Sequence, residues 1–233
     1  FAVLAELPDP GLALAQALHK ILSDQKIEIS SPPVTFSSRG FTFPSNTAIR
    51  VPLYTHYSVP LSQIIKEINE KSNNLYAEQV FKSLSLTRDA VATNKRSIEI
   101  IRNFWKARGL DVNQLFQLDG SGLSPANSVS AGFLTDIMEY MYKKSKHKDT
   151  FFNSLAIAGK AGSIVGFLKN TPLNGKVFAK SGTISRVRSY TGYIIQDGRE
   201  WVFCVMVNNS NGNSRQTLNR IENFLVDITK DKK

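Results

Sequence analysis

The chain has 233 residues, of which 42% are hydrophobic and 21% are charged. This balance is ordinary for a globular protein and excludes a mainly disordered chain, and no apolar stretch approaches the about 18 to 20 residues needed to cross a bilayer. The net charge of +10 favours contact with polyanions such as nucleic acid, anionic lipid or anionic polymers. The basic residues are nevertheless spread along the chain without an RNA-binding or zinc-finger signature, so we expect no nucleic-acid partner.

The cysteine and histidine content argues against a disulfide framework or a metal centre. Cys204 is the only cysteine and cannot form a bridge within the chain. The three histidines share none of the spacings typical of a zinc site; they are His19, His56 and His147. We therefore expect neither a metal ion nor an organic cofactor.

The first part of the chain predicts one helix followed by irregular structure. Residues 10–23 carry apolar side chains at intervals of three and four, with Asp9 as the expected N-cap and a proline at the first helical position. Residues 26–30 alternate between apolar and polar side chains, which predicts a short strand. Prolines, serines and a glycine then indicate a loop over residues 30–47, before an extended piece at residues 50–59.

A long helical pattern opens at Pro60 and is interrupted once. The apolar stripe stops at residues 72–74, which read Ser-Asn-Asn, and resumes up to about Leu84. Serine and asparagine favour caps and turns, because their side chains compete for nearby backbone groups. The sequence therefore predicts two helices with a break at these three residues, and a further helix over residues 95–107 that ends at Gly109.

The second half of the chain predicts a helix, an antiparallel meander and a closing helix. The tight turn Asp197-Gly198-Arg199 is typical of a two-strand hairpin. We therefore expect one α/β domain in which helices flank an antiparallel sheet. The expected elements are a strand at 115–118, a turn-rich loop at 119–124, a helix at 131–144, a glycine-rich loop at 159–166, strands at 176–180, 188–196 and 200–208, and a helix at 213–229.

Two short motifs carry the chemical information in the chain. Ser72-Asn73-Asn74 lies between two predicted helices, and Lys180-Ser181-Gly182-Thr183 lies at the end of a predicted strand. Ser-x-Asn and Lys-[Ser/Thr]-Gly form a set with Ser-x-x-Lys in penicillin-binding proteins and serine β-lactamases. Each motif alone has a structural explanation, as a helix cap or as a close approach between strands. Their order and their structural context together favour the functional interpretation.

The chain resembles the D-alanyl-D-alanine carboxypeptidase/endopeptidase family of low-mass, class C penicillin-binding proteins. The resemblance extends from about Asp9 to the C-terminal helix, and the sequence Asp-Gly-Ser-Gly-Leu-Ser at 119–124 is particularly characteristic of this family. It implies a β-lactamase/transpeptidase-like fold. The stretches that carry it are residues 60–66, 70–79, 118–124, 155–159, 179–183 and 190–193.

The resemblance also implies a mechanism. A serine attacks the peptide carbonyl between two terminal D-alanines, and water then resolves the acyl-enzyme. The Ser72 hydroxyl would relay a proton between the catalytic lysine and the leaving amine, while Asn74 would hold that lysine and the substrate amide. Lys180 would supply positive potential near the terminal carboxylate. The hydroxyls of Ser181 and Thr183 would bind this carboxylate, and the Thr183 N–H would form half of an oxyanion hole.

The residues implied for the site fall into two groups. Most of the family has threonine where Ser181 stands, but serine keeps the hydroxyl that the role requires. Asp119 and Ser121 are interpreted as parts of a structural turn rather than as catalytic groups. The implied catalytic residues are Ser72, Asn74 and Lys180, and the implied substrate-binding residues are Ser181, Gly182 and Thr183.

The nucleophilic serine of this family lies in a Ser-x-x-Lys motif upstream of Ser-x-Asn. The string Ser23-Asp24-Gln25-Lys26 has this spacing, but we expect Ser23 at the C-terminal end of a helix, whereas such a nucleophile needs the N-terminal end. The chain also begins at Phe1 without the basic start of a signal peptide. We therefore expect residues 1–233 to be the C-terminal portion of a transpeptidase-like domain. Without the N-terminal strands and the nucleophile helix, its fold would be incomplete and the chain alone inactive.

Two other functions remain open at the level of the sequence. A non-catalytic module would keep the Lys180 and Thr183 pocket and bind peptidoglycan peptides without cleaving them. A β-lactamase-like hydrolase would use Ser23 as its nucleophile. The expected partners are peptidoglycan peptides ending in D-Ala-D-Ala, β-lactam antibiotics and the missing N-terminal segment of the same protein. The substrate class implies a location in the periplasm or at the cell surface.

Overall fold

The computed structural model describes residues 8–35, 54–89, 91–211 and 213–230. The chain divides into two compact units, residues 1–56 and residues 57–233, and each is described by itself. None of the helices in the described ranges is long and apolar enough to cross a membrane.

The first unit contains the helix α1 (Pro10–Asp24), which confirms the first predicted helix. The Asp9 carboxylate accepts a hydrogen bond from the Leu12 N–H at 2.9 Å, as expected of an N-cap. The strand predicted at residues 26–30 is wrong: Lys26 has a φ of +60° and the segment forms no ladder. Alternation alone does not make a strand, because a strand needs a partner. Residues 36–53, where most of the predicted loop and the start of the extended piece fall, lie outside the described residues.

The second unit is built on an antiparallel sheet with the strand order β3-β4-β5-β6. The hairpin between β5 and β6 is tight because Asp197 and Gly198 both have positive φ values, 51° and 75°, as a type I′ turn requires. The three predicted strands are confirmed, but β4 continues past Lys180, so the Lys-Ser-Gly-Thr motif lies within the strand. The strands are β3 (Ala156–Ile157), β4 (Val177–Ile184), β5 (Val187–Gln196) and β6 (Arg199–Val207).

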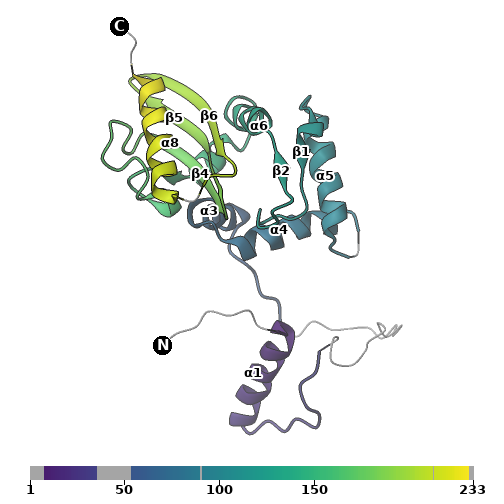
Figure 1. Ribbon diagram of the computed structural model, residues 1–233. Coiled ribbons are helices and arrows are strands. Elements are labelled where there is room, and N and C mark those ends of the chain that lie inside the picture. The colour runs from purple at the N-terminus through teal and green to yellow at the C-terminus, as the bar shows by residue number, and fades with distance from the viewer. Residues whose placement is uncertain (1–7, 36–53, 90, 212, 231–233) are drawn as a thin grey trace. The chain divides into compact units, whose positions relative to one another are not determined.

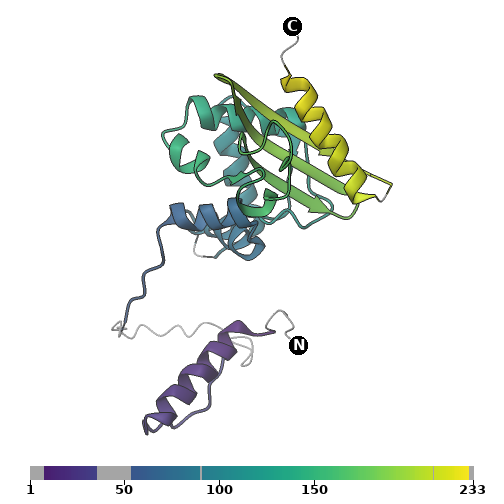
Figure 2. The same cartoon turned by 90° about the vertical axis from the view of Figure 1, so that its left-hand side faces the viewer.

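Helices cover both faces of this sheet (Figure 1, Figure 2). On one face, the helix α8 (Ser214–Thr229) packs its buried Ile221 and Leu225 into the larger core cluster. On the other face, α6 (Ala131–Lys143) and α7 (Lys148–Phe152) enclose an aromatic cluster around Tyr193. The Tyr193 hydroxyl donates to the Met138 carbonyl oxygen at 2.7 Å, so its one polar atom is satisfied.

The remaining helices confirm the predicted break and the helix that follows it. α3 (Leu61–Lys71) and α4 (Asn74–Leu86) flank residues 72–73, and α5 (Asn94–Lys106) ends before Gly109, which has a φ of +82°. Two-residue strands and a one-turn helix are too short to give a periodic pattern, so α7, β3 and one strand of a small ladder were not predicted. That ladder pairs β1 (Leu115–Phe116) with β2 (Ser128–Val129).

The loop at residues 119–124 is a turn that is held by side-chain hydrogen bonds. The Asp119 carboxylate accepts hydrogen bonds from the Gly122 and Ser124 N–H groups at 2.6 and 2.7 Å. The Gly120 N–H donates to a Glu78 carboxylate oxygen at 2.7 Å, which ties the loop to α4. These contacts support the structural interpretation of Asp119 and tether the helix that follows the Ser-x-Asn motif.

Candidate active site

Ser72 lies at the junction of α3 and α4 in an unusual backbone conformation. It occupies the C-cap of α3 with φ 61° and ψ 45°, in the left-handed region that costs a non-glycine residue about 1–2 kcal/mol. The Asn73 side chain accepts a hydrogen bond from the Tyr76 N–H at 3.1 Å and so caps α4. Because Asn73 serves as the cap, the side chains of Ser72 and Asn74 are not used for it. Strain of this kind concentrates at functional sites, which supports a functional role for Ser72.

Lys180 connects the two motifs. Its ammonium donates to the Ser72 hydroxyl oxygen at 2.8 Å and to the Ser181 carbonyl oxygen at 2.6 Å. The two motifs are 108 residues apart in the sequence, so this contact exists only because β4 packs beside the junction of α3 and α4. Phe178 belongs to the aromatic cluster under α6 and α7, and strand alternation places Lys180 on the same face of the sheet.

The other residues of the second motif alternate along β4. Ser181 and Thr183 lie on the opposite face from Lys180, and Thr183 is exposed. The absence of a side chain at Gly182 allows a close approach across the ladder, because a Cβ there would come within 2.6 Å of Ser189 Oγ. The structure thus brings Ser72 to Lys180, keeps Asn74 two residues from Ser72, and aligns the predicted substrate-binding residues on one strand.

One edge of β4 is largely open. β3 pairs with β4 only at Phe178 and Ala179. Among the residues that the structure describes, no strand pairs with that edge from Lys180 onward. An open edge of this kind offers backbone hydrogen-bonding groups to an extended peptide.

Ser163 is a residue of this region that the sequence did not single out. It lies in the 3-10 turn η2 (Gly162–Ile164), within the segment predicted only as a glycine-rich loop. Its hydroxyl oxygen is 3.1 Å from that of Ser181. A serine in a short loop gives no periodic or motif signal, so only the three-dimensional contact identifies it.

Neither string with Ser-x-x-Lys spacing lies beside Lys180 within the second unit. Ser23 is in the last turn of α1, in the first unit, at the helix end where the dipole disfavours an anionic nucleophile. A second string with this spacing runs from Ser145 to Lys148. The Lys148 ammonium lies 3.7 Å from the centre of the Tyr142 ring, beside a cavity that none of the motif residues lines.

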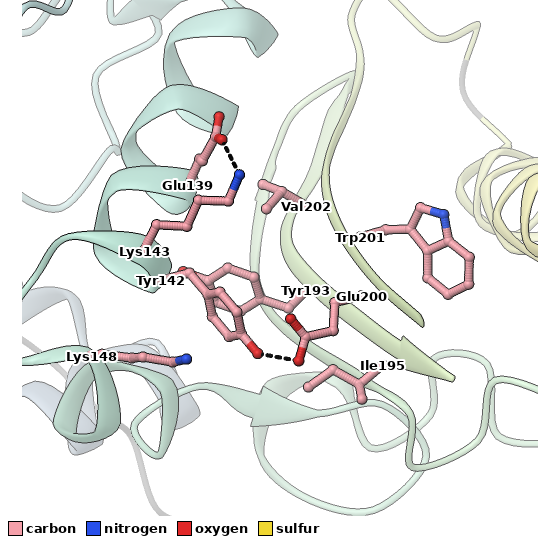
Figure 3. A pocket seen from close by; sticks show the side chains of 9 residues that line it. All are labelled: Glu139, Tyr142, Lys143, Lys148, Tyr193, Ile195, Glu200, Trp201 and Val202. Atoms are coloured by element: carbon pink, nitrogen blue, oxygen red, sulfur yellow. Dashed lines mark hydrogen bonds and ion pairs between the residues drawn. The ribbon is translucent and has the colours of Figure 1, made fainter. Parts of the chain in front are cut away.

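Tyr142 and Lys148 line a cavity of about 570 Å³ between α6, α7 and the strands β5 and β6 (Figure 3). The Tyr142 hydroxyl donates to Glu200 at 2.5 Å, and this bond raises the pKa of Tyr142 to about 12. Lys143 forms an ion pair with Glu139 at 2.6 Å. None of the predicted site residues lines this cavity, so it is not the candidate active site.

The ammonium of Lys180 provides a pH test of the burial of the site. Burial lowers the pKa of Lys180 below its ordinary value of 10.5. Between the lowered pKa and 10.5 the unfolded chain therefore binds more protons than the folded chain, and the free energy of unfolding rises with pH. We expect the wild type to gain stability relative to Lys180→Met as the pH is raised towards 10.5. Urea denaturation of both proteins at pH 7 and pH 10 checks this; a difference that stays constant or reverses contradicts it.

The chain is similar in sequence to curated carboxypeptidases. The penicillin-sensitive carboxypeptidase A of Dictyostelium discoideum is 25% identical over 234 residues, which cover 95% of this chain and 43% of the relative. The D-alanyl-D-alanine carboxypeptidase of Actinomadura sp. (strain R39) is 29% identical over 165 residues, which cover 69% of this chain and 30% of the relative. The chain therefore spans less than half the length of these curated relatives.

Solved structures show the fold. The chain superimposes on penicillin-binding protein 4 of Haemophilus influenzae, solved in complex with a β-lactam, with a TM-score of 0.80 and 23% identity. The match covers 94% of this chain and 52% of that structure. The predicted α/β architecture, with helices flanking an antiparallel sheet, is confirmed. A family model described as D-Ala-D-Ala carboxypeptidase 3 (S13) matches residues 12–231, and the chain therefore belongs to this family of low-mass penicillin-binding proteins.

Proposed function

We propose that residues 57–233 form the substrate-binding half of a serine-type D-Ala-D-Ala carboxypeptidase site that also binds penicillin. The observation that carries this proposal is the hydrogen bond from the Lys180 ammonium to the Ser72 hydroxyl at 2.8 Å. It joins the Ser-x-Asn and Lys-Ser-Gly motifs of the S13 family in one place. The left-handed backbone of Ser72 and the lowered pKa of Lys180 add independent support.

The reaction assigns a role to each group. The nucleophilic serine forms a bond to the carbonyl carbon of the penultimate D-alanine, and the peptide bond to the last D-alanine breaks. Ser72 passes a proton to the departing amine, and water then hydrolyses the ester to restore the serine. Lys180 stabilises negative charge beside Ser72 and supplies positive potential to the site. Asn74 holds the substrate amide from the first turn of α4.

The open edge of β4 is the proposed binding site for the substrate peptide. A peptide that lies along this edge forms backbone hydrogen bonds with the strand. The Thr183 N–H then donates to the carbonyl oxygen that becomes negatively charged, and the hydroxyls of Ser181 and Thr183 bind the terminal carboxylate. Gly182 has no side chain, so none projects from the strand at this point of the proposed binding site.

The nucleophile is proposed to lie outside these 233 residues. Ser23 lies at the C-terminal end of α1, whereas the nucleophile needs the N-terminal end of a helix. Lys148 lines the cavity beside Tyr142, which contains none of the motif residues. In this view residues 1–233 are the C-terminal portion of a transpeptidase-like domain, and an upstream segment of the same protein completes the site. Because the substrate is cell-wall peptide, the protein acts in the periplasm or at the cell surface.

Intact-mass measurement with benzylpenicillin tests the proposal. We expect the longest natural form of the protein to gain the mass of one penicillin, and the isolated chain of 25.9 kDa to gain none. The heat-denatured protein is the control for non-specific acylation. An adduct on the isolated chain would instead make Ser23 or Ser145 the candidate nucleophile. Absence of an adduct on both forms would leave a non-catalytic peptidoglycan-binding module.

A further inference from the structure

The turn η2 contacts both elements that carry the candidate site. A Cβ on Gly162 would come within 2.5 Å of the Glu70 carbonyl oxygen, so the turn packs directly against the end of α3, two residues before Ser72. On the side of the strand, Ser163 Oγ lies 3.1 Å from Ser181 Oγ. The backbone of Gly162, with a φ of +72°, also excludes most side chains at this position.

The turn is anchored firmly enough to hold a hydroxyl in place. Ile164 is only 2% exposed and belongs to the core cluster under α8. The carbonyl oxygen of Ile164 accepts a hydrogen bond from the Gly159 N–H at 3.2 Å, and that of Ala161 accepts one from the Ile157 N–H of β3 at 3.1 Å. Ser163 itself is exposed. The turn therefore presents an accessible side chain from a fixed backbone.

The direction of the bond between the two hydroxyls decides what Ser181 can do. A serine hydroxyl has one proton and two lone pairs. If Ser163 donates to Ser181, the single proton of Ser181 is free to point towards a carboxylate. A chain of this kind, from hydroxyl to hydroxyl to carboxylate, is stronger than its separate bonds because each donor is polarised by the one before it.

We propose that Ser163 is a positioning residue, which orients the Ser181 hydroxyl towards the terminal carboxylate of a bound peptide. This inference rests on the proposed function, because it names the group that sets the carboxylate preference of that same site. Ser163 does not touch the reacting atoms. It acts on recognition of the free carboxylate, and a peptide with a C-terminal amide does not benefit from it.

Binding of a matched pair of peptides to the full 233-residue chain tests the inference. The probes are a peptide ending in D-Ala-D-Ala and the same peptide with a C-terminal amide, titrated by calorimetry. We expect the wild type to prefer the acid, and Ser163→Ala to bind the acid about three- to tenfold more weakly with its affinity for the amide unchanged. Ser163→Thr keeps a hydroxyl and should retain the preference. In a Ser181→Ala background, Ser163→Ala should have no further effect, because residues that act through one bond are not additive.

The control is Ser83→Ala, which removes another exposed serine hydroxyl, one that donates to the Val80 carbonyl oxygen within α4. It should leave both affinities unchanged. If the wild type prefers the acid and Ser163→Ala prefers it as strongly, the role of Ser163 is wrong while the carboxylate pocket stands. Equal losses for acid and amide, or full additivity with Ser181→Ala, also overturn it. If the wild-type chain itself binds the acid and the amide equally, the proposed binding of the carboxylate by Ser181 and Thr183 is wrong. The proposed role of Ser163 is then wrong as well, because it depends on that binding.

Discussion

Replacing Lys180 by methionine is expected to slow acylation by benzylpenicillin at least about 100-fold in the longest natural form of the protein. The ammonium donates a hydrogen bond to Ser72 and supplies the positive charge of the proposed site. Removal of one preorganised donor from a site that stabilises negative charge costs about 10²- to 10³-fold in rate. Methionine has similar length and volume but no charge, so the packing beside α3 and α4 is largely kept.

The matched control is Lys176→Met, which removes a lysine just before β4. Lys176 lies 4.0 Å from Asp197 at the far end of the sheet, and its replacement should leave acylation unchanged. Ser72→Ala, which leaves Lys180 in place, should reduce acylation as well if the two side chains act together. The measurement is the second-order acylation rate, followed by intact mass, with circular dichroism to confirm that each variant is folded. A loss of less than about fivefold in Lys180→Met would remove Lys180 from the proposed mechanism.

Replacing Gly192 by alanine is expected to lower the free energy of unfolding by about 3 kcal/mol or more. Gly192 lies opposite Ala179 in the ladder between β4 and β5. A Cβ there would press on the Phe178 carbonyl oxygen and come within 2.6 Å of the Ala179 Cα. These are backbone atoms of the neighbouring strand, so relief requires the two strands to separate, and overpacking of this kind is among the most destabilising changes known.

Gly166→Ala is the control, because it replaces a glycine by alanine at a position where the added Cβ causes no clash. Its added Cβ would meet no atom within 4 Å, and its φ is not positive, so its stability should stay within about 0.5 kcal/mol of the wild type. Urea denaturation of the three proteins gives the comparison. A loss below about 1 kcal/mol in Gly192→Ala would mean that the two strands separate more easily than their register indicates. Because β4 carries Lys180, we also expect Gly192→Ala to reduce peptide binding.

Helices and strands could be predicted from the sequence wherever their pattern of apolar residues extended over many residues. The helices α4, α5 and α8 repeat their apolar residues over three turns or more, and β5 and β6 are rich in residues that favour strands. The strand predicted at residues 26–30 failed because nothing in the described part of the first unit pairs with it. The helix α7 and the two-residue strands gave no signal because they are shorter than one period of any pattern.

The sequence by itself determined the family and the two motifs, because short motifs and their flanking helices and strands are properties of neighbouring residues. It did not reveal which side chains of those motifs meet. The bond between Lys180 and Ser72, the contact between Ser163 and Ser181, and the open edge of β4 were decided only by the tertiary structure. Each depends on how a strand packs beside a helix end or a turn distant from it in the chain, and such contacts arise from burial of the shared core rather than from local preference.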